Sequence, residues 1–461
     1  MPTRIFESTI PTSPAQLFAW HARAGAFERL RPPWQRIEIE QPAPVEDGSR
    51  VRLRLKKGPF RFSWLAEHRD VVADRGFTDE QVSGPFARWV HRHEFEATAT
   101  GGSILRDRID YALPGGALGR LVAGRSVDRD LESTFAYRHA TTARDLARHG
   151  RFGERRPLRV AVTGASGLVG SSLLPFLTTG GHTAVPLARE GSGAADPRQP
   201  RWSPEAGLRE PETLEPFDAV VHLAGEGIAS GRWSPERKAG IRDSRVRGTR
   251  NLVHTLGRLR RPPRTLVCAS AVGFYGSRGD QVLAETSAAG EGFLAATCQD
   301  WEAAALEAQG LGIRVVLLRF GVILTPAGGA LAKMLLPFRL GGGGVLGSGR
   351  QYMSWITIDD ALGAVHQALM DERLAGAVNA TTPEPVTNRD FTKTLGRVLG
   401  RPTVLPLPAP AARLLLGEMA DEMLLASCRA APAELTKAGF VFDDPTLEPA
   451  LARLLGKARP S

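Results

Sequence analysis

The sequence is poor in cysteine, with only Cys268, Cys298 and Cys428 in a chain of 461 residues. An odd number of widely spaced cysteines argues against a disulfide framework and favours a reducing compartment. Long apolar stretches are also missing, since no run reaches the roughly 18 residues that a membrane span needs. The N-terminus lacks the basic and then apolar pattern of a secretory signal. We therefore expect a cytoplasmic protein without a membrane span.

Blocks of basic residues with interleaved aromatics are absent as well, although the formal net charge is +10. The arginines are scattered among acidic residues, so we predict no nucleic-acid partner. No group of cysteines and histidines has metal-ligand spacing, and we predict no metal site. His91 and His93 share one face of a predicted strand, where a structural or ligand-facing role is favoured over metal binding.

The length predicts two or three domains. Residues 1–150 read as an α+β domain, in which Ser13 caps a helix with Pro14 at its first position. A long helix is predicted over 117–148 from apolar residues at helical spacing. Alternating patterns predict strands at 6–10, 37–40, 50–55, 60–72, 76–83, 89–97 and 103–112.

This first domain resembles the START-like, polyketide-cyclase-like (SRPBCC) superfamily. The resemblance rests on residues 6–20, with Phe-Glu-Ser-Thr-Ile and Ser-Pro-Ala-Gln-Leu-Phe-Ala-Trp, and on 105–121, Leu-Arg-Asp-Arg-Ile-Asp-Tyr-Ala-Leu-Pro-Gly-Gly-Ala-Leu-Gly-Arg-Leu. It implies a curved sheet that grips a long helix around a cavity for a lipid or another hydrophobic ligand. Trp34, Trp64 and Trp89 either line such a cavity or belong to the core.

A second domain follows an Arg- and Gly-rich linker at 149–157. From 158 to 400 strands alternate with helices, which predicts a Rossmann-type, doubly wound parallel sheet. Its first strand, 159–163, runs into a glycine-rich turn and then a helix. Glycines let the backbone approach a diphosphate, and the helix N-terminus offers free N–H groups and a favourable dipole. We predict that the cofactor-binding residues of this turn are Gly164, Ser166, Gly167, Leu168, Val169 and Gly170. A small helical domain is predicted over 405–459.

The end of the next strand predicts which dinucleotide binds. Arg189 stands where an acidic residue would hold the ribose 2′-hydroxyl of NAD. An arginine there can pair with a 2′-phosphate, so we predict NADP(H). Glu190 beside it leaves NAD(H) open.

Further motifs resemble the extended short-chain dehydrogenase/reductase family. They are Leu223-Ala224-Gly225 after a strand, the Ser270 strand end followed by Tyr275-Gly276, and segments 318–322 and 355–360. Segments 226–234, 334–341 and 347–356 narrow the resemblance to atypical epimerase-family proteins that end in a domain of unknown function. The resemblance spans roughly 158–460. It implies a cofactor contact at Leu223 to Gly225, a small-molecule substrate and a homodimer.

One departure from that family concerns its proton relay, a Tyr and a Lys four residues apart on a helix. Glu302 sets the register, which places Leu294 at the Tyr position and Cys298 at the Lys position. Neither side chain can do that chemistry. The remaining catalytic candidates are Ser270 and Tyr275.

Three further residues are candidates for substrate binding: Arg232, Arg350 and Tyr352. Three functions stay open at this point. The chain is an epimerase or oxidoreductase with a rearranged acid/base, an NADP(H)-binding regulator without hydride chemistry, or a carrier of hydrophobic ligands through its first domain.

Overall fold

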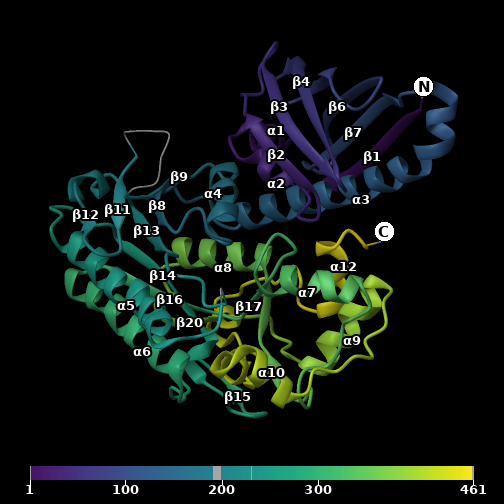
Figure 1. Ribbon diagram of the computed structural model, residues 1–461. Helices are drawn as coiled ribbons and strands as arrows, with labels where there is room; N and C mark the ends of the chain where they lie inside the picture. The colour runs from purple at the N-terminus through teal and green to yellow at the C-terminus, as the bar shows by residue number, and fades with distance from the viewer. Residues whose placement is uncertain (1, 191–198, 230, 459–461) are drawn as a thin grey trace. The chain divides into compact units, whose positions relative to one another are not determined.

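The computed structural model describes residues 2–190, 199–229 and 231–458 (Figure 1). These residues form two compact units. Among the described residues, the N-terminal unit comprises 2–154 with Pro175–Gly181 and 452–458, and the C-terminal unit comprises Arg155–Leu174 with 182–190, 199–229 and 231–451. Within the described ranges, no helix combines the length and the apolarity that a bilayer crossing requires.

The N-terminal unit is a seven-stranded antiparallel sheet with the long helix α3 (Gly116–Gly150). The strand order is β1-β7-β6-β5-β4-β3-β2, which confirms the predicted helix-grip architecture. Its strands are β1 (Thr3–Ile10), β2 (Arg36–Gln41), β3 (Arg50–Lys57), β4 (Phe60–Val72), β5 (Gly76–Ser83), β6 (Arg88–Ala97) and β7 (Ser103–Ala112). Two short helices, α1 (Pro14–Ala22) and α2 (Ala26–Leu30), follow β1.

Local sequence signals account for these elements. Ser13 caps α1 as predicted, because its side chain accepts the N–H of Gln16. Helix α3 runs two residues further than predicted, to Gly150, so the predicted linker begins inside the helix. Trp89 belongs to a buried cluster with Tyr111 and Phe135, which favours the core role for this tryptophan.

The C-terminal unit is built on a six-stranded parallel sheet of order β20-β16-β14-β13-β8-β9. This doubly wound sheet confirms the predicted Rossmann-type fold. Its strands are β8 (Arg159–Thr163), β9 (Thr183–Pro186), β13 (Ala219–His222), β14 (Thr265–Ala271), β16 (Arg314–Phe320) and β20 (Gly376–Ala380). The chain order changes direction at β8, so the carboxyl ends of β8 and β13 form the crevice where ligands of such sheets bind.

Figure 1 shows α5 (Pro235–Gly257) and α6 (Phe293–Leu306) along one face of this sheet and α8 (Ile358–Met370) across the other. A buried apolar cluster with Val220, Leu252, Leu266 and Ala305 joins the first face to α5 and α6. The other helices after β8 are α4 (Gly170–Thr179), α7 (Gly329–Arg339), α9 (Asn388–Leu399), α10 (Ala409–Leu416), α11 (Ala433–Lys437) and α12 (Leu447–Leu454).

Short elements complete this unit. They are β10 (Ala188–Arg189), β11 (Arg201–Ser203), β12 (Gly207–Leu208), β15 (Val282–Leu283), β17 (Val322–Leu324), β18 (Tyr352–Met353), β19 (Trp355–Thr357), β21 (Val386–Thr387), β22 (Arg429–Ala430), the 3-10 helices η1 (Pro211–Leu214), η2 (Val272–Tyr275) and η3 (Glu307–Leu311), and the π-helix η4 (Ala420–Leu424). The C-terminal region is mostly helical as predicted, but β22 also pairs with β15. The last residue of the predicted helical domain, 459, lies outside the described residues.

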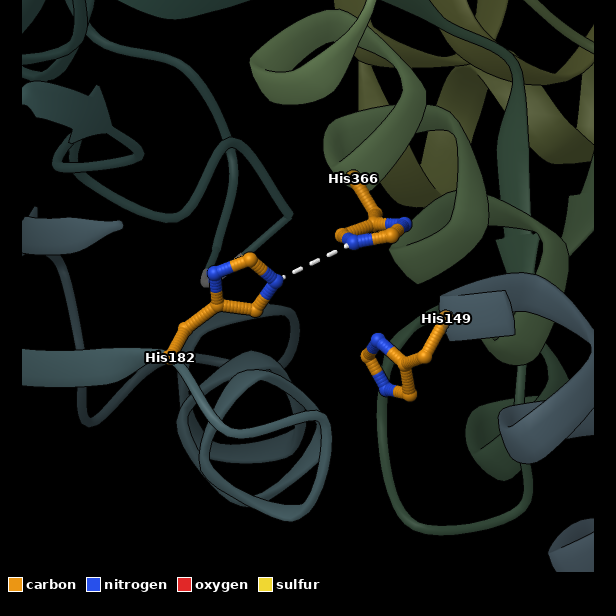
Figure 2. Close-up of side chains that lie close together, drawn as sticks. All are labelled: His149, His182 and His366. Atoms are coloured by element: carbon orange, nitrogen blue, oxygen red, sulfur yellow. Dashed lines mark hydrogen bonds between the residues drawn. The ribbon is translucent and has the colours of Figure 1, made fainter. Parts of the chain in front are cut away.

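A pair of histidines links the start of β8 to α8. The N–H of Leu158 donates to Nδ1 of His182 at 3.0 Å, and Nε2 of His182 lies 3.2 Å from Nε2 of His366 (Figure 2). Because Nδ1 of the neutral His182 ring accepts, its proton is on Nε2, which donates to His366. This bond therefore holds the amino end of the first Rossmann strand against a buried helix.

Candidate functional site

The glycine turn lies at the carboxyl end of β8, where it passes the end of β13. Gly164 has a φ of +65°, and a Cβ there would lie 2.7 Å from the carbonyl carbon of Leu223 and 2.8 Å from the amide nitrogen of Ala224. No real Cβ tolerates such distances to backbone. Glycine is therefore required both for the left-handed conformation and for the close approach of the two chain segments.

The first turn of α4 is packed as closely. A Cβ on Gly170 would lie 2.3 Å from the carbonyl oxygen of Gly164, and the N–H of Gly167 donates to that same oxygen at 2.9 Å. Ser166 and Gly167 are exposed, whereas Leu168 and Val169 are half-buried. The structure thus brings all the predicted turn residues together around a helix N-terminus, the arrangement that binds anions.

A buried polar network supports this turn from below. Nδ1 of His222 lies 2.7 Å from Oγ1 of Thr163, and the same hydroxyl oxygen accepts the N–H of Leu223 at 3.2 Å. On its other side, Nε2 of His222 lies 3.0 Å from Oγ1 of Thr249, which also accepts the indole N–H of Trp301. Burial lowers the pKa of His222 to about 4, so its ring is neutral near pH 7. The role of His222 is not readable from the sequence, because its partners Thr163 and Thr249 lie on other elements of the fold.

The predicted residues after β13 face the turn. Leu223 and Ala224 are half-buried, and Gly225 is exposed. A Cβ on Gly225 would lie 3.2 Å from the guanidinium carbon of Arg245, which donates to the carbonyl oxygen of Glu226 at 3.0 Å. Arg245 extends from α5 and lies over the ring of Trp301. Arg245 thus places a positive charge beside the predicted cofactor loop, a position that no local sequence pattern indicates.

Arg189 ends the two-residue strand β10, which pairs in parallel with β11. Its side chain is exposed. The neighbouring Glu190 forms an ion pair with Arg209. The carboxylate of Glu190, which kept NAD(H) as an alternative cofactor in the sequence analysis, is thus paired with the guanidinium group of Arg209.

The predicted catalytic residues lie in a second buried network. The hydroxyl of Ser270 donates to Oε1 of Glu302 at 2.6 Å, and Arg319 binds both oxygens of Glu302 at 2.8 and 2.7 Å. Tyr275 donates to Oδ1 of Asn379 at 2.7 Å and accepts from Nη1 of Arg319 at 3.0 Å. Ser270 is 3% exposed and Tyr275 is 0% exposed. Burial raises the pKa of Tyr275, so the phenol stays protonated near pH 7.

Leu294 and Cys298 face η2 from α6. A Cβ on Gly273 would lie 3.5 Å from Cβ of Leu294 and 3.9 Å from Sγ of Cys298. Burial raises the pKa of Cys298 to about 12, so this thiol is not a thiolate at neutral pH. At these two positions α6 therefore presents no group that can exchange protons.

The predicted substrate residues lie near the C-terminal region. Arg232 is exposed beside Gly417, and the ring of Tyr352 lies 4.8 Å from the guanidinium carbon of Arg429. Arg350 is exposed, and its backbone N–H donates to Oγ of Ser348. Among the residues that the structure describes, no hydrogen bond or ion pair joins Arg232 to Arg350 or Tyr352.

Comparisons with protein families divide the chain into three segments. Residues 160–380 match the model of the NAD dependent epimerase/dehydratase family. Residues 10–135 match the model of a family described as polyketide cyclase / dehydrase and lipid transport. Residues 407–454 match the model of a domain of unknown function (DUF1731).

Two similar proteins match about two thirds of the chain. An epimerase family protein of Mycobacterium bovis is 46% identical over 292 residues, which make up 63% of this chain and 96% of the relative. The human epimerase family protein SDR39U1 is 33% identical over 301 residues, 65% of this chain and 100% of the relative.

Two solved structures are similar at 32% identity. That of a nucleoside-diphosphate sugar epimerase from Corynebacterium glutamicum has a TM-score of 0.81 and covers 98% of this chain and 90% of that one. The structure of human SDR39U1 with NADPH has a TM-score of 0.60 and covers 65% of this chain and 99% of that one.

Proposed function

Because the chain belongs to the NAD-dependent epimerase/dehydratase family, we propose that its C-terminal unit binds NADP(H) and transfers a hydride between the nicotinamide and a carbinol or carbonyl carbon. The observation that carries the cofactor proposal is the turn at Gly164, packed so closely on Leu223 and Ala224 that no side chain fits. Because no side chains cover such a turn, its backbone N–H groups are accessible and can bind a diphosphate. The NADPH in the structure of the human relative supports the same cofactor.

Arg189 is the residue proposed to choose between the two dinucleotides. Its guanidinium would pair with the 2′-phosphate that NADPH has and NADH lacks. In Arg189→Ala we expect NADPH affinity to fall about 10- to 100-fold, as the loss of a charge-assisted contact implies, and NADH affinity to stay unchanged. Titration calorimetry on the full chain measures both. Arg258→Ala, which removes an exposed arginine after α5, is the matched control. A parent that prefers NADH would contradict the proposal.

A nucleoside diphosphate sugar is the proposed substrate class. The support is the Corynebacterium glutamicum relative described as a nucleoside-diphosphate sugar epimerase. Arg232, Arg350 and Tyr352 are proposed to bind it, since two exposed guanidinium groups suit a diphosphate. The test is turnover by the purified chain with NADPH or NADP⁺ and a panel of such sugars, with simple carbonyl compounds in parallel.

A second candidate function is NADP(H) binding without hydride chemistry, as in a regulator. It is favoured by Leu294 and Cys298 at the relay positions and by the buried hydrogen bonds of Ser270 and Tyr275. The catalytic role of these two residues stays a prediction, and their burial supports a positioning role instead. Tight NADPH binding with no turnover across the panel would favour this candidate.

The N-terminal unit is proposed to carry a hydrophobic ligand, which its match to a lipid-transport family supports. Mass spectrometry of an organic extract of the purified full chain would identify such a ligand. An extract without one after expression in lipid-replete cells would count against this proposal.

A further inference from the structure

The inner part of the N-terminal sheet carries a row of histidines and aspartates from adjacent strands. The strand register places His68 opposite Asp79 and Asp79 opposite His91. Two residues further along β6, His93 lies opposite Asp107 of β7. Residues at i and i+2 of a strand share a face, and directly opposite residues have neighbouring Cβ atoms. Pairing of the strands therefore collects side chains that are far apart in the sequence.

Asp107 is the centre of this group. Its Oδ1 lies 2.8 Å from Nε2 of His91, and its Oδ2 lies 2.7 Å from Nε2 of His139 in α3. His139 is in turn 2.9 Å from Oγ of Ser8. Asp107 is 3% exposed, so these bonds are sheltered from water. With its Nε2 bonded to Asp107, His91 has Nδ1 as the ring nitrogen that can bind another group.

Asp79 is the more accessible member of the group. Its Oδ1 lies 2.6 Å from Nδ1 of His68, and its Oδ2 lies 3.3 Å from Nε2 of His93. About a quarter of its side chain, 26%, is exposed, whereas His91 is 3% and His93 is 6% exposed. The group therefore has one open side, at Asp79.

Nδ1 of His93 is buried and lies 2.8 Å from Oδ1 of Asp107, so the two groups form an ion pair when the ring is protonated. The contact does not have the alignment of a hydrogen bond. A buried polar atom in such a contact is imperfectly satisfied, and a metal ion would give the neutral ring a better partner.

We propose that Asp79, His91 and His93 bind one divalent transition-metal ion inside the N-terminal unit. One ligand atom from each residue lies within 4.8 Å of the others. Bonds of about 2.1 Å would bring these atoms to a spacing of roughly 3.4 Å, which takes only a small inward rotation of the side chains. Two imidazoles and one carboxylate suit Zn²⁺ or Fe²⁺ rather than Mg²⁺ or Ca²⁺, which prefer all-oxygen ligands.

The neighbouring side chains complete the site. Asp107 and His68 would orient the ligands, as carboxylates and other partners do around metal-bound histidines and aspartates. Three protein ligands leave at least one position for water or a small ligand, and the accessible edge of Asp79 places that position on the open side. This metal site would give the N-terminal unit a chemistry beyond the carriage of an apolar molecule.

The competing structure is a metal-free network in which a proton on His93 lies between Asp79 and Asp107. Only the metal site binds a metal ion at one equivalent per chain, so metal stoichiometry separates the two alternatives.

The experiment uses the full chain without a histidine tag, stripped with EDTA and then dialysed. Titration calorimetry with ZnCl₂ measures affinity and stoichiometry, and the visible spectrum of the Co²⁺ form reports the ligand set.

We expect one Zn²⁺ per chain and a Co²⁺ spectrum typical of nitrogen and oxygen ligands. Asp79→Asn and His93→Gln should each weaken Zn²⁺ binding at least tenfold. His254→Gln is the control, because His254 is an exposed histidine on α5 of the C-terminal unit, and should leave the affinity within twofold. Circular dichroism and NADPH binding check that each variant is folded.

Absence of stoichiometric binding in the parent would overturn the proposal. So would unchanged Zn²⁺ affinity in Asp79→Asn, since the metal would then be held elsewhere in the chain. If His93→Gln fails to fold, Asp79→Asn decides alone, because the change is nearly isosteric and falls on the partly exposed side.

Discussion

The carboxylate of Glu422 accepts the N–H of Leu294 at 3.1 Å, so a side chain from η4 caps the helix that carries the altered relay positions. Its other oxygen accepts the N–H of Phe293 at 3.0 Å. A carboxylate at a helix N-terminus satisfies free N–H groups and complements the helix dipole. The C-terminal region thereby fixes the start of α6, where Leu294 stands in place of a tyrosine.

Removal of this cap should loosen the start of α6. In Glu422→Ala we expect a loss of about 1 kcal/mol of stability and faster amide exchange in a peptide covering 292–298. Hydrogen–deuterium exchange followed by mass spectrometry measures the latter directly. Asp421→Ala, which removes an exposed carboxylate of η4 paired with Arg413, should leave that peptide unchanged. Equal exchange in Glu422→Ala and the parent would show that the cap does not hold the helix.

A methyl group at Gly170 should damage the cofactor turn. Its Cβ would lie 2.3 Å from the carbonyl oxygen of Gly164, so the backbone must move apart and the N–H groups lose their arrangement. We expect Gly170→Ala to weaken NADPH binding at least tenfold by titration calorimetry. Gly310→Ala provides the control, because a Cβ there meets nothing within 4 Å. Parent-like affinity in Gly170→Ala would mean that this packing does not shape the cofactor site.

A matched pair of tyrosines separates the positioning role of Tyr275 from a catalytic one. Tyr275→Phe removes the phenol hydroxyl, so Oδ1 of Asn379 and one N–H of Arg319 each lose a buried hydrogen bond. This loss should lower the free energy of unfolding by about 1–3 kcal/mol. We expect a lower thermal midpoint with NADPH affinity within twofold of the parent. Tyr352→Phe, on a half-buried ring, should leave the midpoint within the error. An unchanged midpoint in Tyr275→Phe with lost turnover would instead support catalysis by Tyr275.

The sequence predicted features whose causes are local. Strands β4, β5, β7 and β8 have the predicted bounds, because alternation and bounding turns are readable within a few residues. The glycine turn was predictable for the same reason, since Gly164 and Gly170 stand six residues apart between a strand and a helix.

Contacts between distant segments were not predictable. Ser270, Glu302 and Arg319 meet only after β14, α6 and β16 have packed. Asp79 joins His91 and His93 through the register of β5 on β6, which spacing within one strand does not reveal. Metal-ligand spacing along the chain therefore does not indicate this group.

Acid should weaken the C-terminal unit through His222. Burial lowers its pKa in the folded chain to about 4, against 6.5 for the free side chain. The unfolded chain therefore binds a proton first as the pH falls, so stability is lost between about pH 6.5 and 4, by up to about 3 kcal/mol.

The measurement compares thermal midpoints at pH 7 and pH 5 for three proteins. In His222→Gln the thermal midpoint should fall less between pH 7 and pH 5 than in the parent, because the titrating group is gone. The midpoint at pH 7 should itself be lower than that of the parent, because the bonds to Thr163 and Thr249 are lost. His254→Gln, an exposed histidine on the same helix as Thr249, should show the drop of the parent. Other buried histidines contribute equally to all three proteins and cancel in the comparison. A drop of the same size in His222→Gln would mean that His222 does not resist protonation in the folded chain.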